Sequence, residues 1–375
     1  MGEATCATAA EYGNVLAMPS QPYIVIMAGG RGERLWPFST RSHPKQFLQF
    51  NGPSFLQITV AQITEMVPAS HIFVVVNQEH AELAAQQLPE LPVENILCEP
   101  AGRGTAACLA FAAHILERED PHAVMIALAS DLVIPDKAPF QHLLQAGADL
   151  AAREEAFVLL GATPTHPATN LGYIGCAEPV DNAQGVPVYR VARFVEKPDA
   201  ATADALLQTG QYFWNCGIFV WRVDHFWREM AEHLPAYAAA FRSIPAWQHR
   251  RELPSLLAEV YSGLTPVTID YGLIEKSAQH CIALALPFTW HHVGDWEAIG
   301  VLLPQDASGN AAQARHVSID TAGSIIIAEN ANKIIATIGV EDLVIVDTPD
   351  ALLVMDKHRA QETRRILQEI QRMDG

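Results

Sequence analysis

The sequence predicts an α/β fold built around a largely parallel sheet, followed by a small all-β unit and a final helix. From Pro22 onward, short apolar runs alternate with longer amphipathic stretches, as in successive βα units. The chain has 375 residues, enough for more than one domain. Beyond residue 315, short β-rich runs are broken by Gly, Asn, Asp and Pro, and no helical pattern returns until the last residues.

The first half alternates strands and helices. We expect buried strands at 23–28, 72–76, 95–98 and 123–129, and helices beginning at Ser54, which caps the first of them, and covering 79–88 and 105–118. Ligands of open α/β sheets bind beyond the carboxyl ends of the strands. The loops that follow Ala28, Cys98 and Ala129 should therefore share one crevice.

The second half is less regular and ends in a separate unit. We expect strands at 188–196 and 217–221, and a polar linker at 304–314. The predicted organisation is a flexible tail at 1–21, a main domain at 22–303 and a terminal unit at 315–375. Four apolar residues at helical spacing predict a terminal amphipathic helix that packs on a neighbour: Ile366, Leu367, Ile370 and Met373.

Composition excludes several classes of protein. Twenty-four Lys and Arg against 42 Asp and Glu give a formal charge of −18, which argues against a surface that coats nucleic acid. No apolar stretch approaches the roughly 20 residues of a membrane span, and the first residues lack the pattern of a signal peptide. The six cysteines are dispersed without metal-ligand spacing. A reduced, cytoplasmic protein is the simplest expectation.

One loop concentrates positive charge against this acidic background. It follows the first strand and contains Gly29, Gly30 and Gly32, where backbone N–H groups can face a phosphate. Four cations stand at 31–45 against one acid, while Gln46 to Gly102 contains no Lys or Arg. Such a cluster suits a polyphosphate better than a mixed solvated surface. The loop does not fit the P-loop motif, because it contains no G-K-[ST]. It does not fit the dinucleotide motif either, because Leu35 replaces the third glycine.

The sequences of this loop and of several later segments resemble those of a known family. GGRGERLWPFSTRSHPKQF (29–47) resembles the signature of sugar nucleotidyltransferases, and its PKQF ending resembles their mannose-1-phosphate guanylyltransferase members. Further blocks match in family order: EPAGRGTAA (99–107), NLGYI (170–174), FVEKP (194–198), WNCGIF (214–219), TIDYGLIEK (268–276) and DLVIVDTPDALLV (342–354). The resemblance implies a Rossmann-like nucleotidyltransferase domain with a mostly parallel mixed sheet, and a left-handed β-helix-like unit after it.

The resemblance also implies a reaction and a set of site residues. GMP would pass from GTP to α-D-mannose 1-phosphate, giving GDP-mannose and pyrophosphate, with Mg²⁺ as cofactor. The implied catalytic residues are Arg34, Lys45, Asp131 and Lys197, with Asp131 also the Mg²⁺ ligand. The implied nucleotide-binding residues are Gly29, Gly30, Gly32, Glu99, Arg103 and Thr105. The implied sugar-phosphate residues are Gly172, Glu196, Lys197, Asn215 and Tyr271. Relatives also self-associate through the β unit, which makes a homodimer an expectation.

One block departs from the family pattern. The family reads W-x-D-V-G-x-W, with the Asp as a second metal ligand, whereas His292 stands at that position here. Imidazole is a poor ligand for Mg²⁺. Three interpretations stay open: Asp295 substitutes as the ligand, the metal is softer, or the chain is a weakly active regulatory homologue that binds nucleotide sugars. The same reaction with another sugar phosphate or base is a further alternative.

Overall fold

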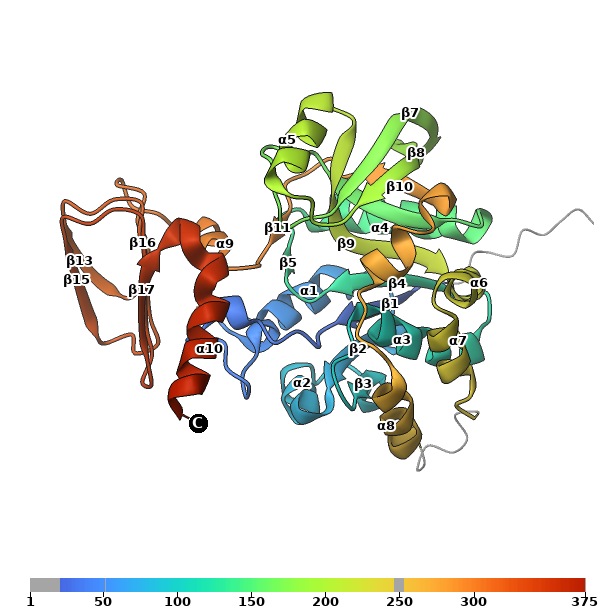
Figure 1. Ribbon diagram of the computed structural model, residues 1–375, viewed down its shortest axis with the longest axis horizontal. Helices are drawn as coiled ribbons and strands as arrows, with labels where there is room; N and C mark the ends of the chain where they lie inside the picture. Colours follow the sequence, from blue (N-terminus) through green and yellow to red (C-terminus); the bar gives the residue numbers. More distant parts are fainter. Residues whose placement is uncertain (1–20, 51, 246–252, 375) are drawn as a thin grey trace, which may run out of the picture.

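The computed structural model describes residues 21–50, 52–245 and 253–374 of the chain. These residues form one large α/β domain, a smaller β unit and a final helix (Figure 1). The expected N-terminal tail lies almost wholly outside the described residues. None of the helices in the described part of the chain combines the length and the apolar character needed to cross a membrane.

A large mixed sheet organises the first domain. Within the described residues its order is β3-β2-β1-β4-β9-β6-β10-β8-β7. Its strands are β1 (Tyr23–Met27), β2 (Ile72–Asn77), β3 (Ile96–Glu99), β4 (Val124–Ala129), β6 (Phe157–Ala162), β7 (Tyr173–Ala183), β8 (Val186–Val195), β9 (Tyr212–Arg222) and β10 (Cys281–Ala285). The first four strands are parallel to one another, as predicted.

Parallel pairing is concentrated in the part of the sheet that carries β1 to β4. Strand β9 runs antiparallel to both β4 and β6, and its first residues also pair with β7. Strands β7, β8 and β10 form further antiparallel pairs, although β10 is parallel to β6. The ligand crevice expected from parallel topology therefore belongs to the end of the sheet that carries β1 to β4.

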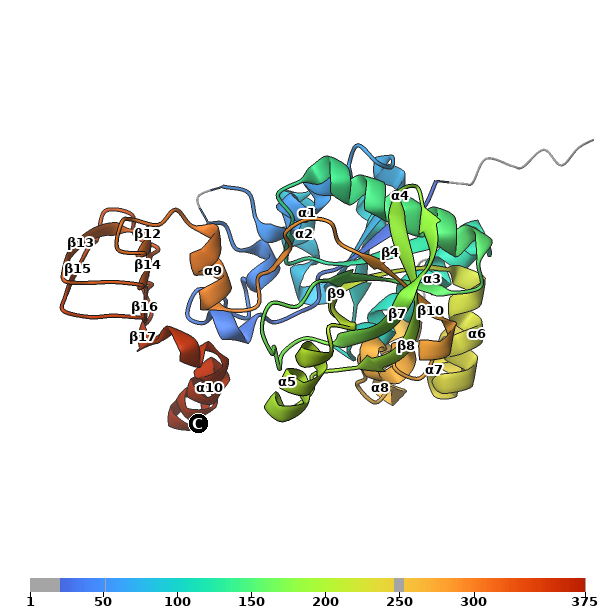
Figure 2. The same ribbon diagram turned by 90° about the horizontal axis from the view of Figure 1, so that it is seen from above.

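Helices cover both faces of this sheet (Figures 1 and 2). Alternation along β1 directs Ile24 and Ile26 to one core and Val25 to the other. The first core is covered by α1 (Phe55–Ile63), α2 (Ala81–Gln87) and α4 (Lys137–Arg153). The second is covered by α3 (Thr105–Glu119), α6 (Val223–His233), α7 (Pro235–Arg242) and α8 (Leu253–Gly263). Helix α1 begins as predicted, with the Ser54 hydroxyl accepting from Gln57 N in a capping box.

Smaller elements complete the domain near the carboxyl end of β4. Strand β5 (Leu132–Val133) pairs with β11 (His291–His292), which places the anomalous histidine position next to the segment that follows β4. Helix α5 (Ala200–Thr209) packs near β9, and α9 (Trp296–Leu302) leads toward the terminal unit.

The terminal unit has the strand pattern of a β-helix. Strands β12 (Ala311–Gln313), β14 (Ile325–Ala328) and β16 (Leu343–Asp347) stack in parallel, and β17 (Leu352–Asp356) closes that sheet antiparallel. The alternate strands β13 (Arg315–Ile319) and β15 (Ile334–Ile338) form a second parallel pair. Strand β12 lies within the stretch expected as a linker, so the first rung begins earlier than predicted. The left-handed sense of the helix stays a prediction.

The chain ends in a short 3₁₀ segment, η9 (Lys357–Glu362), and in α10 (Thr363–Asp374). The predicted apolar stripe exists, but only Leu367 and Ile370 are partly buried, whereas Met373 is exposed. Helix α10 lies against η1 (Glu33–Leu35), a turn of the glycine-rich loop. Both ribbon views show it between the terminal β unit and the large domain (Figures 1 and 2).

Candidate active site

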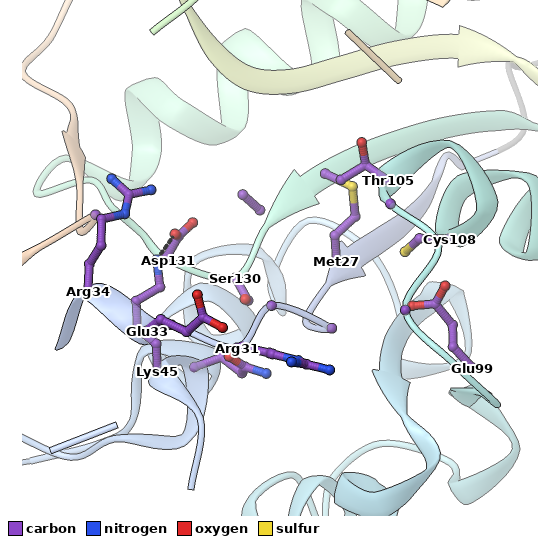
Figure 3. A pocket seen from close by; sticks show the side chains of 18 of the residues that line it. Met27, Arg31, Glu33, Arg34, Lys45, Glu99, Thr105, Cys108, Ser130 and Asp131 are labelled. Atoms are coloured by element: carbon purple, nitrogen blue, oxygen red, sulfur yellow. Dashed lines mark hydrogen bonds and ion pairs between the residues drawn. The ribbon is translucent and has the colours of Figure 1, made fainter. Parts of the chain in front are cut away.

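The loops after β1, β3 and β4 share one cavity, as the topology predicts. Its volume is about 380 Å³. Figure 3 shows Arg34, Lys45 and Asp131 gathered at one end, and Glu99, Cys108 and Thr105 at the other. The lining also includes Gly29, Gly30, Arg31, Gly32, Glu33, Arg103, Ser130 and Arg364. The cavity thus has a cation-rich end and an end with a buried carboxyl group.

The glycine-rich loop owes its path to close packing at Gly32. This residue has φ +66°, and a Cβ built on it would lie 2.3 Å from the Cβ of Lys45. Glycine is required there for both reasons. The loop is further tied by Ser39, whose hydroxyl donates to the Gly32 carbonyl at 2.6 Å. By contrast, a Cβ at Gly30 would meet nothing within 4 Å, so this residue leaves open space in front of the cavity.

Lys45 and Asp131 form the ion pair at the cation-rich end. The Lys45 ammonium donates to the Asp131 carboxylate, and also to the Val293 carbonyl oxygen at 2.8 Å. Both side chains are largely buried. Val293 N in turn donates to the Asp131 carbonyl oxygen at 3.0 Å. The two predicted catalytic residues are therefore together, held by the segment that follows β11.

Arg34 occupies the same end. Burial, and then repulsion from Arg364, lower the pKa of its guanidinium, while the carboxylates of Asp295 and Asp131 oppose that effect. Its Nη1 donates to Gln361 Oε1 at 3.3 Å. Arg41, from the same cluster in the sequence, is 89% exposed and pairs with Glu79 at 3.1 Å. The basic cluster divides into residues that line the cavity and one surface ion pair.

Glu99 forms the opposite end of the cavity. Its carboxyl group is buried and accepts a hydrogen bond from the Tyr261 hydroxyl at 3.1 Å. Burial raises the pKa of Glu99 to about 7, although the Tyr261 bond favours the ionised form. A Cβ at Gly29 would lie 3.0 Å from Glu99 Oε2, so glycine gives this carboxyl group its space.

Arg103 and Thr105 line the cavity and also hold neighbouring segments. Arg103 Nε donates to the Tyr261 carbonyl oxygen at 2.7 Å. Thr105 is the first residue of α3, and the cap position belongs to Gly104. The Thr105 hydroxyl accepts from Ile269 N at 2.8 Å. Capping of α3 therefore does not explain Thr105; the hydroxyl anchors the segment that leads to Asp270.

The predicted sugar-phosphate residues gather in a second cluster, at the ends of β7, β8 and β9. A Cβ at Gly172 would lie 2.5 Å from Glu196 Oε2 and 3.2 Å from Asn215 Cβ. The Tyr271 hydroxyl donates to the Glu196 carbonyl oxygen at 3.3 Å. Lys197, at φ +45°, turns its ammonium onto the Glu196 carboxylate. The structure thus brings all five residues together from four separate parts of the sequence.

Asp270 joins this cluster, although only its neighbour Tyr271 was selected from the sequence block. Asn215 Nδ2 donates to Asp270 Oδ1 at 2.9 Å. Burial, and then the charge of Glu196, raise the pKa of Asp270 to about 6. Two close carboxyl groups beside one lysine form a polar cluster whose charge responds to an incoming ligand.

Asp295, the expected substitute metal ligand, is held by two hydrogen bonds. Its Oδ1 accepts from Ala298 N at 3.2 Å and caps α9, and its Oδ2 accepts from Gln361 Nε2 at 2.9 Å. It is not among the residues that line the cavity. The need to cap α9 accounts for this carboxylate. The His292 side chain lies outside the described residues.

Two further residues were not selected from the sequence: Tyr261, which donates to Glu99, and Arg364, which lines the cavity. Tyr261 belongs to α8, and a single aromatic residue in a helix carries no signal of a role beside Glu99. Arg364 belongs to α10, where the apolar stripe indicated only packing. Its approach to the glycine-rich loop depends on the placement of the whole terminal unit.

The fold and the cavity define a class of protein: an α/β protein with a cation-lined cavity at the carboxyl ends of its parallel strands. A family model described as nucleotidyl transferase matches residues 23–308, and one described as a MannoseP isomerase/GMP-like beta-helix domain matches 314–370. The chain belongs to the nucleotidyl transferase family, as the resemblance predicted.

Relatives of known name agree with this assignment. A mannose-1-phosphate guanylyltransferase of Escherichia coli is 35% identical over 348 residues, which are 92% of this chain and 73% of the relative. The xanthan biosynthesis protein XanB of Xanthomonas campestris is 36% identical over 352 residues, covering 92% and 72%. A solved structure described as a mannose-1-phosphate geranyltransferase from Thermus thermophilus has a TM-score of 0.82 and 32% identity, and the match covers 94% of this chain and 99% of that one.

Proposed function

We propose that the chain transfers GMP from GTP to α-D-mannose 1-phosphate, forming GDP-mannose and pyrophosphate. The names of the relatives support this reaction. One structural observation carries it for this chain: a cation-lined cavity and a second cluster suited to a sugar phosphate are joined by the Thr105–Ile269 hydrogen bond. Two anionic substrates have to be brought together, and the fold supplies two adjoining polar sites.

The chemistry is a displacement at phosphorus. A phosphate oxygen of the sugar 1-phosphate forms a bond to the α-phosphorus of GTP, the bond from that phosphorus to the bridging oxygen breaks, and pyrophosphate leaves with the bonding electrons. Positioning and neutralisation of charge dominate such reactions. In this proposal Arg34 and Lys45 neutralise the departing pyrophosphate, and Lys197 holds the sugar phosphate. Glu196 and Asn215 face the sugar hydroxyls, and the ionised Glu99 accepts the N–H groups of guanine.

Asp131 is the residue that we propose to hold Mg²⁺. A carboxylate oxygen is a hard ligand, and Mg²⁺ commonly takes one or two carboxylates together with substrate phosphates. The described residues contain no group of three His, Cys, Asp or Glu side chains arranged to hold a metal. Asp131 therefore fits an ion shared with the triphosphate rather than a site formed without substrate. When bound, Mg²⁺ supplies positive charge to the phosphate oxygens.

An assay of pyrophosphate release tests the reaction. The full chain with GTP, mannose 1-phosphate and Mg²⁺ should release pyrophosphate and form GDP-mannose in equal amounts. Panels of nucleoside triphosphates, sugar 1-phosphates and divalent metals test the specificity. Binding of GDP-mannose in calorimetry without turnover on any panel would overturn the proposal and support the regulatory homologue; activity gained in His292→Asp would then show that position 292 limits catalysis.

Two less detailed expectations belong to this proposal. A cytoplasmic location suits the five cysteines of the described part, which form no disulfide there. Self-association through the terminal β unit is consistent with its exposed aliphatic residues Val317, Ile319, Ile334 and Ile338. Cell fractionation and light scattering of the purified chain test these two points.

A further inference from the structure

The terminal helix contributes a cation to the nucleotide cavity. Arg364, in the first turn of α10, lines the cavity although it lies more than 300 residues from the glycine-rich loop. Its Nε lies 3.4 Å from Glu33 Oε2. A guanidinium carries four further N–H donors on its Nη atoms, so this ion pair leaves donors for a second anion.

Several contacts hold this end of the helix, and one of them joins it to the glycine-rich loop. Gln361 accepts from Arg34 Nη1 at 3.3 Å and donates to Asp295 Oδ2 at 2.9 Å. The Thr363 side chain is buried and donates to the Ala360 carbonyl oxygen at 2.8 Å. The helical turn that carries Arg364 is therefore held in place by hydrogen bonds.

The charges around Arg364 suit an anion. Arg34 and Arg364 are close enough to repel each other, and that repulsion helps to lower the pKa of Arg34. Two guanidinium groups that face one cavity are stabilised when an anion enters between them. Glu33 is the one acid among the cations at 31–45, and Arg364 neutralises it in the free protein.

We propose that Arg364 binds the β- and γ-phosphates of the nucleoside triphosphate, so that the terminal helix completes the triphosphate end of the site. This inference rests on the proposed function, because it needs a triphosphate in the cavity. Arg34, Lys45 and Arg364 then surround the group that leaves as pyrophosphate. Arg364 supports binding of the triphosphate and of the leaving group, and it has no part in holding the base or the sugar.

Calorimetry with Arg364→Ala tests this assignment, with GTP and GMP as the two probes. The variant should bind GTP about five- to tenfold more weakly and GMP as wild type does, and the loss should shrink in high salt because the Arg364 side chain is 61% exposed. Arg364→Lys should recover part of the GTP affinity. Arg365→Ala is the matched control, since the neighbouring Arg365 pairs with Glu362 at 2.9 Å outside this cavity.

Glu33→Gln separates phosphate binding by Arg364 from a structural latch, that is, an Arg364–Glu33 ion pair that only holds α10 against the glycine-rich loop. It breaks the same ion pair but frees Arg364, so GTP should bind at least as tightly as in wild type. Equal losses of GTP affinity in Glu33→Gln and Arg364→Ala, or equal losses of GTP and GMP in Arg364→Ala, would show a latch and overturn the inference. Unchanged GTP affinity in Arg364→Ala would overturn it as well. A wild-type chain that binds no nucleoside triphosphate would instead overturn the proposed function, and this inference with it.

Discussion

Lys45 donates to the Asp131 carboxylate and to the Val293 carbonyl oxygen, and so connects three segments that are distant in the sequence. One belongs to the glycine-rich loop, one follows β4 and one follows β11. A single ammonium group at this junction has two functions. It balances a buried carboxylate in the free protein, and in the proposed reaction it also neutralises the triphosphate.

Lys45→Ala should lower kcat by at least about 100-fold, because a buried charge that stabilises a developing anion is worth several kcal/mol. The variant should also lose stability, on the order of 1–3 kcal/mol, because Asp131 then lacks its ion-pair partner. Pyrophosphate release and urea unfolding measure the two effects. Arg41→Ala, in the same stretch but paired with exposed Glu79, should keep near wild-type activity. Equal rates in Lys45→Ala and wild type would contradict the assignment.

Gly32→Ala and Gly30→Ala form a matched pair in the glycine-rich loop. At Gly32 the new methyl group meets Lys45 Cβ at 2.3 Å and φ is +66°, whereas at Gly30 it meets nothing within 4 Å. Gly32→Ala should therefore lower the free energy of unfolding by about 1–3 kcal/mol, lower the melting temperature and displace Lys45. Gly30→Ala should fold with wild-type stability, and any rise in its KM for GTP reports the approach of the triphosphate. Similar melting temperatures for the two variants would rule out this packing argument.

Glu99 should make stability depend on pH. Its pKa is raised from 4.5 to about 7 by burial, so the folded state binds the proton more tightly than the unfolded state. Its contribution to stability is fully present below pH 4.5 and is lost as the pH rises through about 7. The loss is on the order of 3 kcal/mol. Glu99→Gln removes the titrating group, so the difference in free energy of unfolding between the two proteins should change across that window. Parallel curves from pH 4 to 8 would show that Glu99 keeps an ordinary pKa.

The sequence was sufficient for the parts of the molecule that depend on local pattern. The four parallel strands and the capping of α1 by Ser54 follow from short apolar runs and one hydroxyl. The shared crevice follows from topology, because the loops after β1, β3 and β4 must leave the same edge of the sheet. The sequence motifs of the family then identified residues of both polar clusters, the cavity at the glycine-rich loop and the cluster around Glu196.

The remainder depends on contacts between distant segments. Helix α4 carries its apolar residues at helical spacing but was not anticipated, since the regular alternation of elements fades after β4. The sequence does not show that α9 begins after Asp295, so the cap that this residue forms was not anticipated, and its role as a metal ligand stays a prediction. Arg364 enters the cavity only because the β unit returns α10 to the glycine-rich loop. A terminal amphipathic pattern indicates packing but not where the charged residues of that helix will point.

Lys197 combines the ammonium group that we propose to hold the sugar phosphate with a left-handed backbone conformation, and the two can be separated. Its φ of +45° is uncommon for any residue but glycine, and its side chain reaches Glu196. Lys197→Gly removes the amine and relieves the backbone, but it also leaves the buried Glu196 carboxylate without its ion-pair partner. The two effects on stability oppose each other, so the variant should stay within about 1 kcal/mol of wild type, while kcat/KM for mannose 1-phosphate falls at least about 100-fold.

Gln184→Gly is the matched control, since Gln184 also has positive φ, at 53°, but lies in the turn between β7 and β8. It should retain wild-type activity. Calorimetric melting and steady-state kinetics of both variants supply the comparison. If Lys197→Gly were active, the ammonium group would not be the phosphate ligand; if it were inactive because it failed to fold, the strained conformation would depend on the Lys197–Glu196 ion pair.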